Sequence, residues 1–434
     1  MTKTVKFSGR SVMGMAPIGQ RCAVRPPSTR KVAASSLLFM LAVLAPCGFA
    51  QTRTTWKWTV ENVDASAQFT SLAVDSEGNV HVAYAFGSAG YDLKYAFRAS
   101  DTAKWFNMLL EKEYSSYATN ISVDPSENPH ICLTPREVKY ASWDGKTWRI
   151  QQIDPAGGTA EFNCSLAFSK DGAAHLTWYQ TRNAGNQGFL HIKYANLSGG
   201  VWTARTIDFD RECGKWNSVV VDSEGHPHVA YSVFPPGELK YGVFDGKDWH
   251  ITAVDSPGTG TTRYPTGMGV SLAPKDQGEY FMSFYESPGY DGDTRNPGSL
   301  KVAHLVNAKW HIETVDQVFK GQSWTEYATM LELDKHGNPH ISYEDGGALK
   351  HAYWDGERWR VQLLVAAGGG DKTLYSSMKI APDDTVYISY RDPFDGSLCV
   401  AVGHPTSVEI PKSTSVKTSQ SQHEGDASRT TPKK

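Results

Sequence analysis

The sequence has little net charge and lacks a hydrophobic run long enough for a secure membrane span. Its 434 residues carry a formal net charge of −3, so the chain lacks the broad positive field with which proteins attract nucleic acid. An apolar run near the N-terminus, AASSLLFMLAVLAP at 33–46, is too short to cross a bilayer comfortably. We therefore expect no nucleic-acid partner, and no stable membrane span once this segment is removed.

Residues 1–50 have the layout of a secretory signal peptide. Basic residues, among them Arg30 and Lys31, precede the apolar run, and CGFA at 47–50 supplies small residues before a cut that would leave Gln51 first. The sequence therefore predicts a secreted or periplasmic protein. An uncleaved membrane anchor is the alternative.

Cysteine is scarce, and only four of the six cysteines follow the predicted signal peptide. Four cysteines allow three pairings. We expect Cys164 at the start of a strand and Cys213 in the loop before the next repeat. Because both should lie near one face, a Cys164–Cys213 disulfide is a hypothesis that the sequence leaves open. Cys132 and Cys399 lie in strands of different repeats and are expected to be buried thiols.

The composition changes after Gly403. Residues 405–434 are rich in Ser, Thr and Lys and contain almost no apolar side chains. Such a segment cannot bury enough surface to fold. We predict a folded domain at 54–404, followed by a disordered tail at 405–434.

Aromatic and turn-forming residues are abundant, and a short pattern built from them recurs seven times. Apolar and polar residues alternate within the copies, as they do in a β-strand. The copies are WTVENVD at 58, WFNMLLE at 105, WRIQQID at 148, WTARTID at 202, WHITAVD at 249, WHIETVD at 310 and WRVQLLV at 359.

Three further strand-like segments recur between these copies. They are typified by SLAVD at 71, VHVAY at 80 and LKYA at 93. Each unit therefore has four short strands in about 45 to 50 residues, which is the signature of a β-propeller blade.

The two ends of the repeat complement each other. The copy at 58–64 is a fourth strand that is not preceded by the other three strands of a unit. The last unit, at 378–403, has three strands and lacks a fourth. We expect the N-terminal strand to complete the last blade, which closes the ring and removes the free sheet edge. The prediction is an all-β, seven-bladed β-propeller of four-stranded antiparallel blades. An open array of β units is the alternative.

The repeats resemble the bacterial-neuraminidase-repeat, or Asp-box, propeller family. SWDGKTW at 142–148 looks like a shortened Asp box, S-x-D-x-G-x-T-W, and VFDGKDW at 243–249 and YWDGERW at 353–359 are weaker versions. The resemblance covers residues 54–404 and implies the architecture rather than an activity. Sialidases of this family carry an F/Y-R-I-P sequence, which this chain lacks, so we do not expect a sialidase.

The connections between strands fall into two groups. First-to-second and third-to-fourth turns are short and uniform, such as SEGN at 76–79, whereas the other two kinds vary, up to YESPGYDGDTRNPGS at 285–299. In an antiparallel blade the two groups lie on opposite faces. Because functional loops diverge while scaffold turns stay uniform, we place the site on the face with the varied loops, which we call the variable face.

Residues that recur in most blades are attributed to the scaffold. We expect the recurring histidines to form hydrogen bonds within the scaffold, and the recurring lysines to pack their stems while their heads reach a carbonyl or carboxylate. The histidines are His81, His130, His175, His228 and His340. The lysines are Lys94, Lys139, Lys193, Lys240, Lys301 and Lys350.

The predicted site consists of residues that break the repeat on the variable face. Arginines bind carboxylate or sulfate through paired hydrogen bonds, and aromatic rings stack on the apolar faces of sugars. The predicted substrate-binding residues are Arg136, Arg182, Trp216, Tyr285, Glu286, Trp324, Glu326, Tyr375, Arg391 and Asp392. This composition favours an oligosaccharide or polysaccharide, including an anionic one. Ordinary loop packing is the alternative for any single residue.

Three functions fit these residues. One is a glycan-binding propeller without chemistry, and another is a platform for a protein partner. The remaining candidate is a polysaccharide lyase, because some lyases acting on sulfated algal polysaccharide are similar propellers. Arg263 would neutralise a uronate carboxylate and Tyr264 would take the neighbouring proton in a β-elimination. A glycoside hydrolase would instead need two carboxylates at a defined separation, which Glu286, Glu326 and Asp392 could supply.

We expect no cofactor and no metal site. DGDTRN at 291–296 places oxygen ligands at alternate positions, as a calcium loop does. Arg295, however, stands where such a loop has a ligand or its turn glycine. Calcium at this segment is the alternative.

Overall fold

The structure is a computed structural model. It describes residues 52–87, 91–112, 119–134, 137–153, 159–181, 190–210, 212–234, 237–256, 266–275, 278–286, 298–318, 329–368 and 374–409. All of them belong to one compact unit, Ala50–Lys434. Within these ranges the chain forms 28 strands and no α-helix, and no helix there has the length and hydropathy needed for a membrane span.

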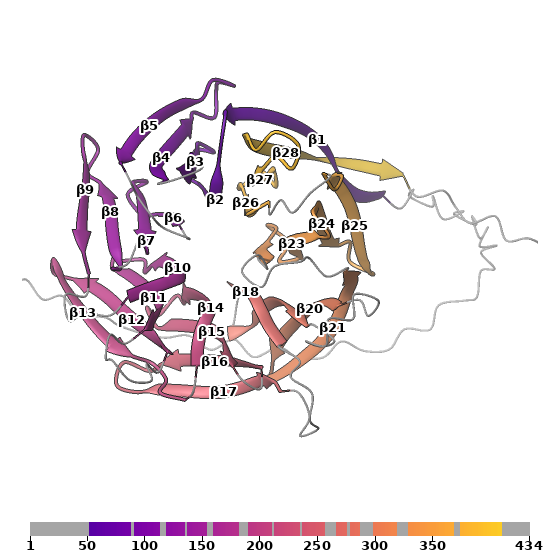
Figure 1. Cartoon of the computed structure of the whole chain (residues 1–434). Helices are drawn as coiled ribbons and strands as arrows, with labels where there is room; N and C mark the ends of the chain where they lie inside the picture. Colours follow the sequence, from indigo (N-terminus) through magenta and orange to yellow (C-terminus); the bar gives the residue numbers. More distant parts are fainter. Residues whose placement is uncertain are drawn as a thin grey trace, which may run out of the picture. The chain divides into compact units, whose positions relative to one another are not determined.

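The strands form seven four-stranded antiparallel sheets arranged as blades around a ring (Figure 1). Blade 1 contains β2 (Gln68–Val74), β3 (Val80–Phe86), β4 (Asp92–Arg98) and β5 (Phe106–Glu111). Blade 2 contains β6 (Thr119–Val123), β7 (Pro129–Leu133), β8 (Lys139–Trp143) and β9 (Trp148–Gln152). Blade 3 contains β10 (Thr159–Phe168), β11 (Ala174–Thr181), β12 (Leu190–Ser198) and β13 (Val201–Thr206).

The remaining blades repeat this order from the ring centre outward. Blade 4 contains β14 (Glu212–Val221), β15 (Pro227–Phe234), β16 (Glu238–Phe244) and β17 (Trp249–Asp255). Blade 5 contains β18 (Thr266–Pro274), β19 (Tyr280–Glu286), β20 (Gly298–Val306) and β21 (Lys309–Val318). Blade 6 contains β22 (Thr329–Leu333), β23 (Pro339–Asp345), β24 (Ala348–Trp354) and β25 (Trp359–Val365). Blade 7 contains β26 (Ser377–Ile380), β27 (Val386–Arg391), β28 (Leu398–Glu409) and β1 (Thr52–Asp64).

The N-terminal strand closes the ring as the sequence predicts. β1 pairs antiparallel with β28 from Thr52↔Glu409 to Asp64↔Leu398, so the strand order of blade 7 is β26, β27, β28, β1. The pairing carries β28 to Glu409, five residues into the segment predicted as a tail. The predicted all-β, seven-bladed fold is confirmed.

The recurring tryptophan has a packing role at the seams, by which we mean the interfaces between neighbouring blades. At four seams it stands edge-to-face against the third-strand tyrosine of the preceding blade, with ring centroids 5.0 to 5.3 Å apart. Such aromatic pairs add stability beyond the area that they bury. The pairs are Tyr95–Trp148, Tyr140–Trp202, Tyr194–Trp249 and Tyr241–Trp310.

The recurring histidines and lysines serve the scaffold, as predicted. His228, for example, lies 2.5 Å from the Tyr241 hydroxyl through Nδ1 and 3.1 Å from Asp222 through Nε2, and it is buried. The lysines reach carboxylates: Lys94 Nζ donates to Asp64 at 2.9 Å, across the seam between blades 7 and 1. The histidine contacts hold the strands of one blade together, and the Lys94 contact joins neighbouring blades.

Candidate functional site

A cavity of about 170 Å³ lies at the centre of the ring. All seven inner strands contribute to its wall, including the residues just before β26. One inner-strand position recurs in the wall, three residues before the end of each strand. We call these residues the belt: Ser71, Asn120, Ser165, Ser218, Ser271, Met330 and Ser377. The other lining residues precede the belt on each strand, which places the cavity on the variable-face side.

The belt side chains carry hydrogen bonds from blade to blade. Each Ser or Asn oxygen accepts the backbone N–H that follows the belt position of the next blade, at 3.0 to 3.1 Å. The pairs are Ser71–Ile121, Asn120–Leu166, Ser165–Val219, Ser218–Leu272, Ser271–Leu331 and Ser377–Leu72. Met330 has no oxygen, so the seam between blades 6 and 7 lacks this bond. The belt satisfies N–H groups that the inner edge of a sheet would otherwise leave unpaired.

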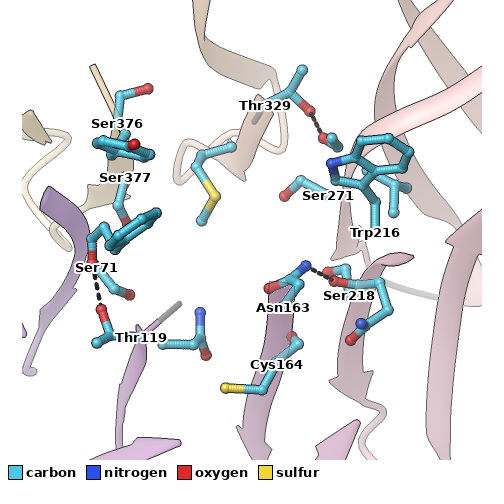
Figure 2. Close-up of a pocket in the computed structure, with 18 of the residues that line it drawn as sticks. Ser71, Thr119, Asn163, Cys164, Trp216, Ser218, Ser271, Thr329, Ser376 and Ser377 are labelled. Atoms are coloured by element: carbon cyan, nitrogen blue, oxygen red, sulfur yellow. Dashed lines mark hydrogen bonds between the residues drawn. The ribbon is translucent and has the colours of Figure 1, made fainter. Parts of the chain in front are cut away.

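A second layer of polar side chains lies one residue before the belt. Thr70, Thr119 and Thr329 donate their hydroxyl protons to backbone carbonyls of the preceding blade, at 2.6 to 2.7 Å. The side chains of this layer face a second-strand residue of the preceding blade, as in Thr329 against Ser283 at 2.6 Å. Figure 2 shows both layers grouped around one space.

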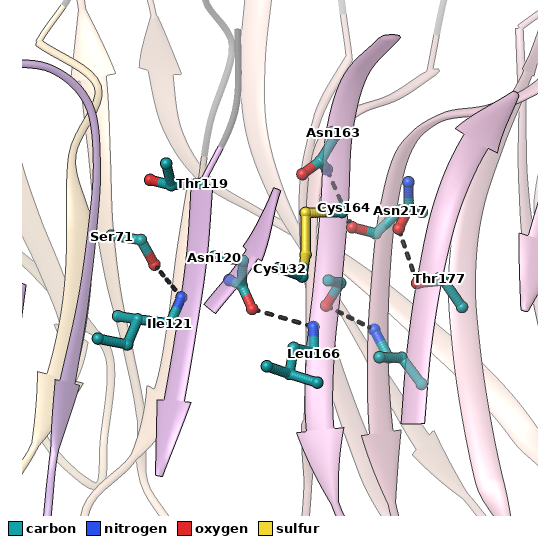
Figure 3. Close-up of a disulfide and its surroundings, with 12 residues drawn as sticks. Ser71, Thr119, Asn120, Ile121, Cys132, Asn163, Cys164, Leu166, Thr177 and Asn217 are labelled. Atoms are coloured by element: carbon teal, nitrogen blue, oxygen red, sulfur yellow. Dashed lines mark hydrogen bonds between the residues drawn. A yellow bond between two sulfur atoms is a disulfide. The ribbon is translucent and has the colours of Figure 1, made fainter. Parts of the chain in front are cut away.

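The disulfide occupies this second layer and corrects the predicted pairing. Cys164 stands one residue before the belt in blade 3 and is bonded to Cys132 on β7 of blade 2, with Cα atoms 6.3 Å apart (Figure 3). The predicted Cys164–Cys213 bond is wrong, because Cys213 points into the packing beside Ile192. Cys213 and Cys399 are buried free thiols, and burial raises the pKa of Cys213 to about 12.

Three aromatic rings line the cavity: Phe69, Trp216 and Tyr375. The rings of Phe69 and Tyr375 lie 4.4 Å apart between centroids. Both residues have a positive φ, 51° and 48°, in the left-handed region that bulky side chains rarely adopt. Gly269, at the equivalent position of blade 5, has a φ of 62°. Two blades thus accept strain in order to place an aromatic ring where a third has glycine.

The described wall carries no carboxylate, and its charged group is Lys215. The Lys215 ammonium lies 5.2 Å from the centre of the Trp216 ring, within the range of a cation–π contact. The described part of the chain also contains no group of three His, Cys, Asp or Glu side chains that could hold a metal. The predicted calcium segment at 291–296 lies outside the described residues.

Two of the predicted binding residues, Trp216 and Tyr375, line the cavity. Four others lie at strand ends. Tyr285 is buried and contacts the backbone of Glu344 at 2.9 Å, and Glu286 pairs with Lys301 at 2.8 Å. Asp392 caps its own turn by accepting the N–H of Phe394, and the Arg391 N–H donates to the Leu374 carbonyl. The other predicted residues lie outside the described chain: Arg136, Arg182, Arg263, Tyr264, Trp324 and Glu326.

The belt itself was not among the predicted site residues. Sequence reasoning assigned recurring residues to the scaffold, and a serine recurs at the belt in five blades. The centre of a propeller is the one place where a recurring residue from every blade converges on a single ligand. The signal was present in the repeats SLAVD at 71 and SVVVD at 218.

No protein-family model matches the chain, and no curated protein matches it. Among solved structures, it is similar to an ulvan lyase of polysaccharide lyase family 25 bound to -[GlcA(1-4)Rha3S]-, with a TM-score of 0.54 and 12% identity over 82% of this chain and 98% of that one. A fucose-specific lectin from Aleuria aurantia gives a TM-score of 0.44 and 12% identity over 71% and 99%. A Dyadobacter fermentans protein of unknown function gives 0.46 and 14% over 81% and 99%. At these identities the likeness is one of fold, and the chain is a seven-bladed β-propeller.

Proposed function

We propose that the protein recognises an oligosaccharide or polysaccharide on its variable face, with the central cavity as the core of the site. The observation that carries this proposal is the wall itself, in which three aromatic rings stand above a belt of hydroxyl and amide groups. Rings bind the apolar faces of sugars, while hydroxyls and amides bind their oxygen atoms. The strain at Phe69 and Tyr375 supports the proposal, because strained backbone persists where function requires it.

Retention on immobilised polysaccharides tests this proposal. The panel should contain neutral, uronate-containing and sulfated chains, with Trp216→Phe compared with the wild type. We expect retention on at least one polysaccharide and weaker retention of the variant, since the smaller ring offers less stacking area. Phe106→Ala is the matched control, because Phe106 is 53% exposed on the outer strand β5. No retention at all would refute glycan recognition and leave a protein partner as the candidate.

A polysaccharide lyase is the second candidate. Arg263 and Tyr264 precede Thr266, where β18 begins, and that strand supplies Gly269, Val270 and Ser271 to the cavity wall. Tyr84, a described tyrosine near the end of β3, is a poor base, because burial and a hydrogen bond to Asp64 raise its pKa well above the usual value. Tyr264 stays the candidate base for a β-elimination.

Absorbance near 235 nm follows the unsaturated uronate that such a lyase would release. A rise with a uronate-containing polysaccharide that disappears in Tyr264→Phe would establish the activity. Retention of the same polysaccharide without a rise would leave a binding protein. We further propose export through residues 1–50, in keeping with a polysaccharide ligand outside the cytoplasm.

A further inference from the structure

The belt holds hydrogen-bond donors that nothing in the described chain uses. The hydroxyl oxygen of each belt serine accepts one hydrogen bond, from a backbone N–H of the next blade. The hydroxyl proton of the same serine has no acceptor among the described residues. The threonines one residue earlier differ, because their protons go to backbone carbonyls. Ser71, Ser271 and Ser377 are only 3%, 6% and 3% exposed, and all three line the cavity.

The Asn120 amide and the Met378 N–H are two further donors. Asn120 lines the cavity and uses Oδ1 to accept the Leu166 N–H, which leaves its amide NH₂ group without a partner among the described residues. At Met330 the belt has no oxygen, so the N–H of Met378 lacks the partner that the other six seams provide. An O–H group that already accepts a hydrogen bond is also polarised into a stronger donor.

The described part of the same wall has no carboxylate. Its lining residues include no Asp or Glu, and the charged group among them is the ammonium of Lys215. Buried donors need acceptors, because an unpaired polar group in a protein interior costs free energy. A group with several oxygen lone pairs and no proton of its own satisfies the most donors at once.

We propose that the belt is an oxyanion site, which binds a carboxylate or sulfate group at the centre of the ring. The group belongs either to an acidic sugar or to a free anion. The acidic-sugar form rests on the proposed function, whereas the free-anion form does not. About 170 Å³ is below the ~300 Å³ at which small-molecule pockets usually begin, so the cavity has room for one sugar unit rather than for a passing chain.

Isothermal titration of the folded chain with glucuronate, glucose and inorganic sulfate tests the proposal. We expect glucuronate or sulfate to bind and glucose to bind at least tenfold more weakly. Asn120→Asp is the sharpest variant, because Asp keeps the oxygen that accepts the Leu166 N–H while replacing the donor by a negative charge. We expect it to weaken binding of the acidic probe by about tenfold or more, the scale of one hydrogen bond to a charged group.

A matched pair of serine variants separates donor loss from structural loss. Ser271→Ala removes a belt donor, whereas Ser283→Ala removes a buried serine that does not line the cavity and reaches it only through its hydrogen bond to Thr329. We expect weaker binding of the acidic probe in Ser271→Ala alone.

The outcomes distinguish the two proposals. Glucose binding as tightly as glucuronate, no binding of any acidic probe, or unchanged binding in a folded Asn120→Asp variant would overturn the oxyanion site. Glycan recognition would still stand if neutral polysaccharides were retained. Sulfate binding that Asn120→Asp abolishes, without retention of any polysaccharide, would support a free-anion site and refute glycan recognition.

Discussion

Phe69 and Tyr375 show how a single residue position can be given to function. Each stands two residues before the belt with a positive φ, a backbone state that costs a non-glycine residue about 1–3 kcal/mol. Glycine takes the same state without that cost, as Gly269 does in blade 5. Stability alone would therefore favour glycine at all three positions.

Replacing Tyr375 by Gly separates the contribution of the aromatic ring to binding from the cost of the strained backbone to stability. We expect weaker retention on the recognised polysaccharide, because a stacking surface is lost, while the free energy of unfolding changes by no more than about 1 kcal/mol, since relieved strain offsets lost packing. Urea unfolding and the retention assay measure the two effects. A loss of several kcal/mol with unchanged retention would make Tyr375 a structural residue.

The disulfide is a residue-scale feature with its own test. Cys132 and Cys164 are 32 residues apart in sequence, so we expect the double replacement by Ala to cost about 3 kcal/mol of unfolding free energy. Cys213→Ala, at a buried free thiol, should cost less, about 1 kcal/mol. Non-reducing peptide maps should contain a Cys132–Cys164 peptide, and a Cys164–Cys213 peptide would contradict the structure.

The repeat alignment contained enough information to find this pairing. Cys132 lies at the second-strand position of blade 2 and Cys164 one residue before the belt of blade 3. Those two positions face each other at other seams, as Thr177 and Asn217 do at 2.8 Å. The Cys164–Cys213 hypothesis considered only the order of strands along the chain. The Cys132–Cys164 contact depends instead on which positions of neighbouring blades face each other.

At the scale of single elements, β1 is the strand on which closure depends. Trp56 is 6% exposed, donates its indole N–H to the Asp384 carbonyl at 3.2 Å, and packs against His340 and Tyr353 of blade 6. β1 thus completes the sheet of blade 7 and also binds the neighbouring blade.

Two substitutions on β1 test its role. We expect Trp56→Ala to lower the free energy of unfolding by about 3–5 kcal/mol, as is usual for a large buried aromatic. Val60→Ala, at a residue 56% exposed on the same strand, should change it by less than about 0.5 kcal/mol. Equal effects in urea unfolding would mean that the inner face of β1 does not secure the ring.

β11 carries a buried histidine whose protonation couples the fold to pH. His175 Nδ1 contacts the Tyr194 hydroxyl at 2.7 Å, but its Nε2 has no partner among the described residues, where His228 has Asp222. Burial lowers the pKa of His175 from 6.5 to about 4, although Asp171 opposes the change. Between these two pH values the unfolded chain takes up a proton that the folded chain refuses.

We therefore expect the free energy of unfolding to fall as the pH drops from 6.5 to about 4, by up to about 3 kcal/mol from His175, and this contribution to level off below. Urea unfolding across that range measures the slope. His175→Gln should make it shallower, and an unchanged slope in that variant would contradict the assignment.

The elements were the most predictable part of the molecule. Strands repeat the alternation of WHITAVD at 249 and PHVAY at 227 in blade after blade, so each copy supports the next. The end of β28 was less predictable. Residues 405–409 are polar, and they form strand because β1 supplies hydrogen-bonding partners from more than 340 residues away.

At the scale of the whole molecule, the ring is held unevenly. Six seams carry a belt hydrogen bond, whereas the seam between blades 6 and 7 has Met330 instead and leaves the buried Ser342 hydroxyl without a partner in the described chain. That seam relies on ion pairs, among them Lys335 with Asp384 at 2.8 Å and Lys379 with Glu332. The packing of Trp56 on β1 against His340 and Tyr353 of blade 6 therefore matters most at this seam.

The site as a whole could be predicted only in part. Trp216 and Tyr375 could be selected because they break the repeat and lie on varied connections. The belt serines were not selected, because a residue shared by most blades has the sequence signature of scaffold. Only the closed ring brings those serines together, and closure is a property of all seven blades at once.

The most direct test of the central claim is hydrogen–deuterium exchange with and without the polysaccharide that the panel retains. A ligand in the central cavity should slow exchange in inner-strand segments of several blades at once, at 69–72, 119–121 and 375–378, and leave the outer strands unchanged. Slowing confined to outer strands or to the uniform turns, or no retained polysaccharide at all, would contradict the claim that the cavity is a glycan site.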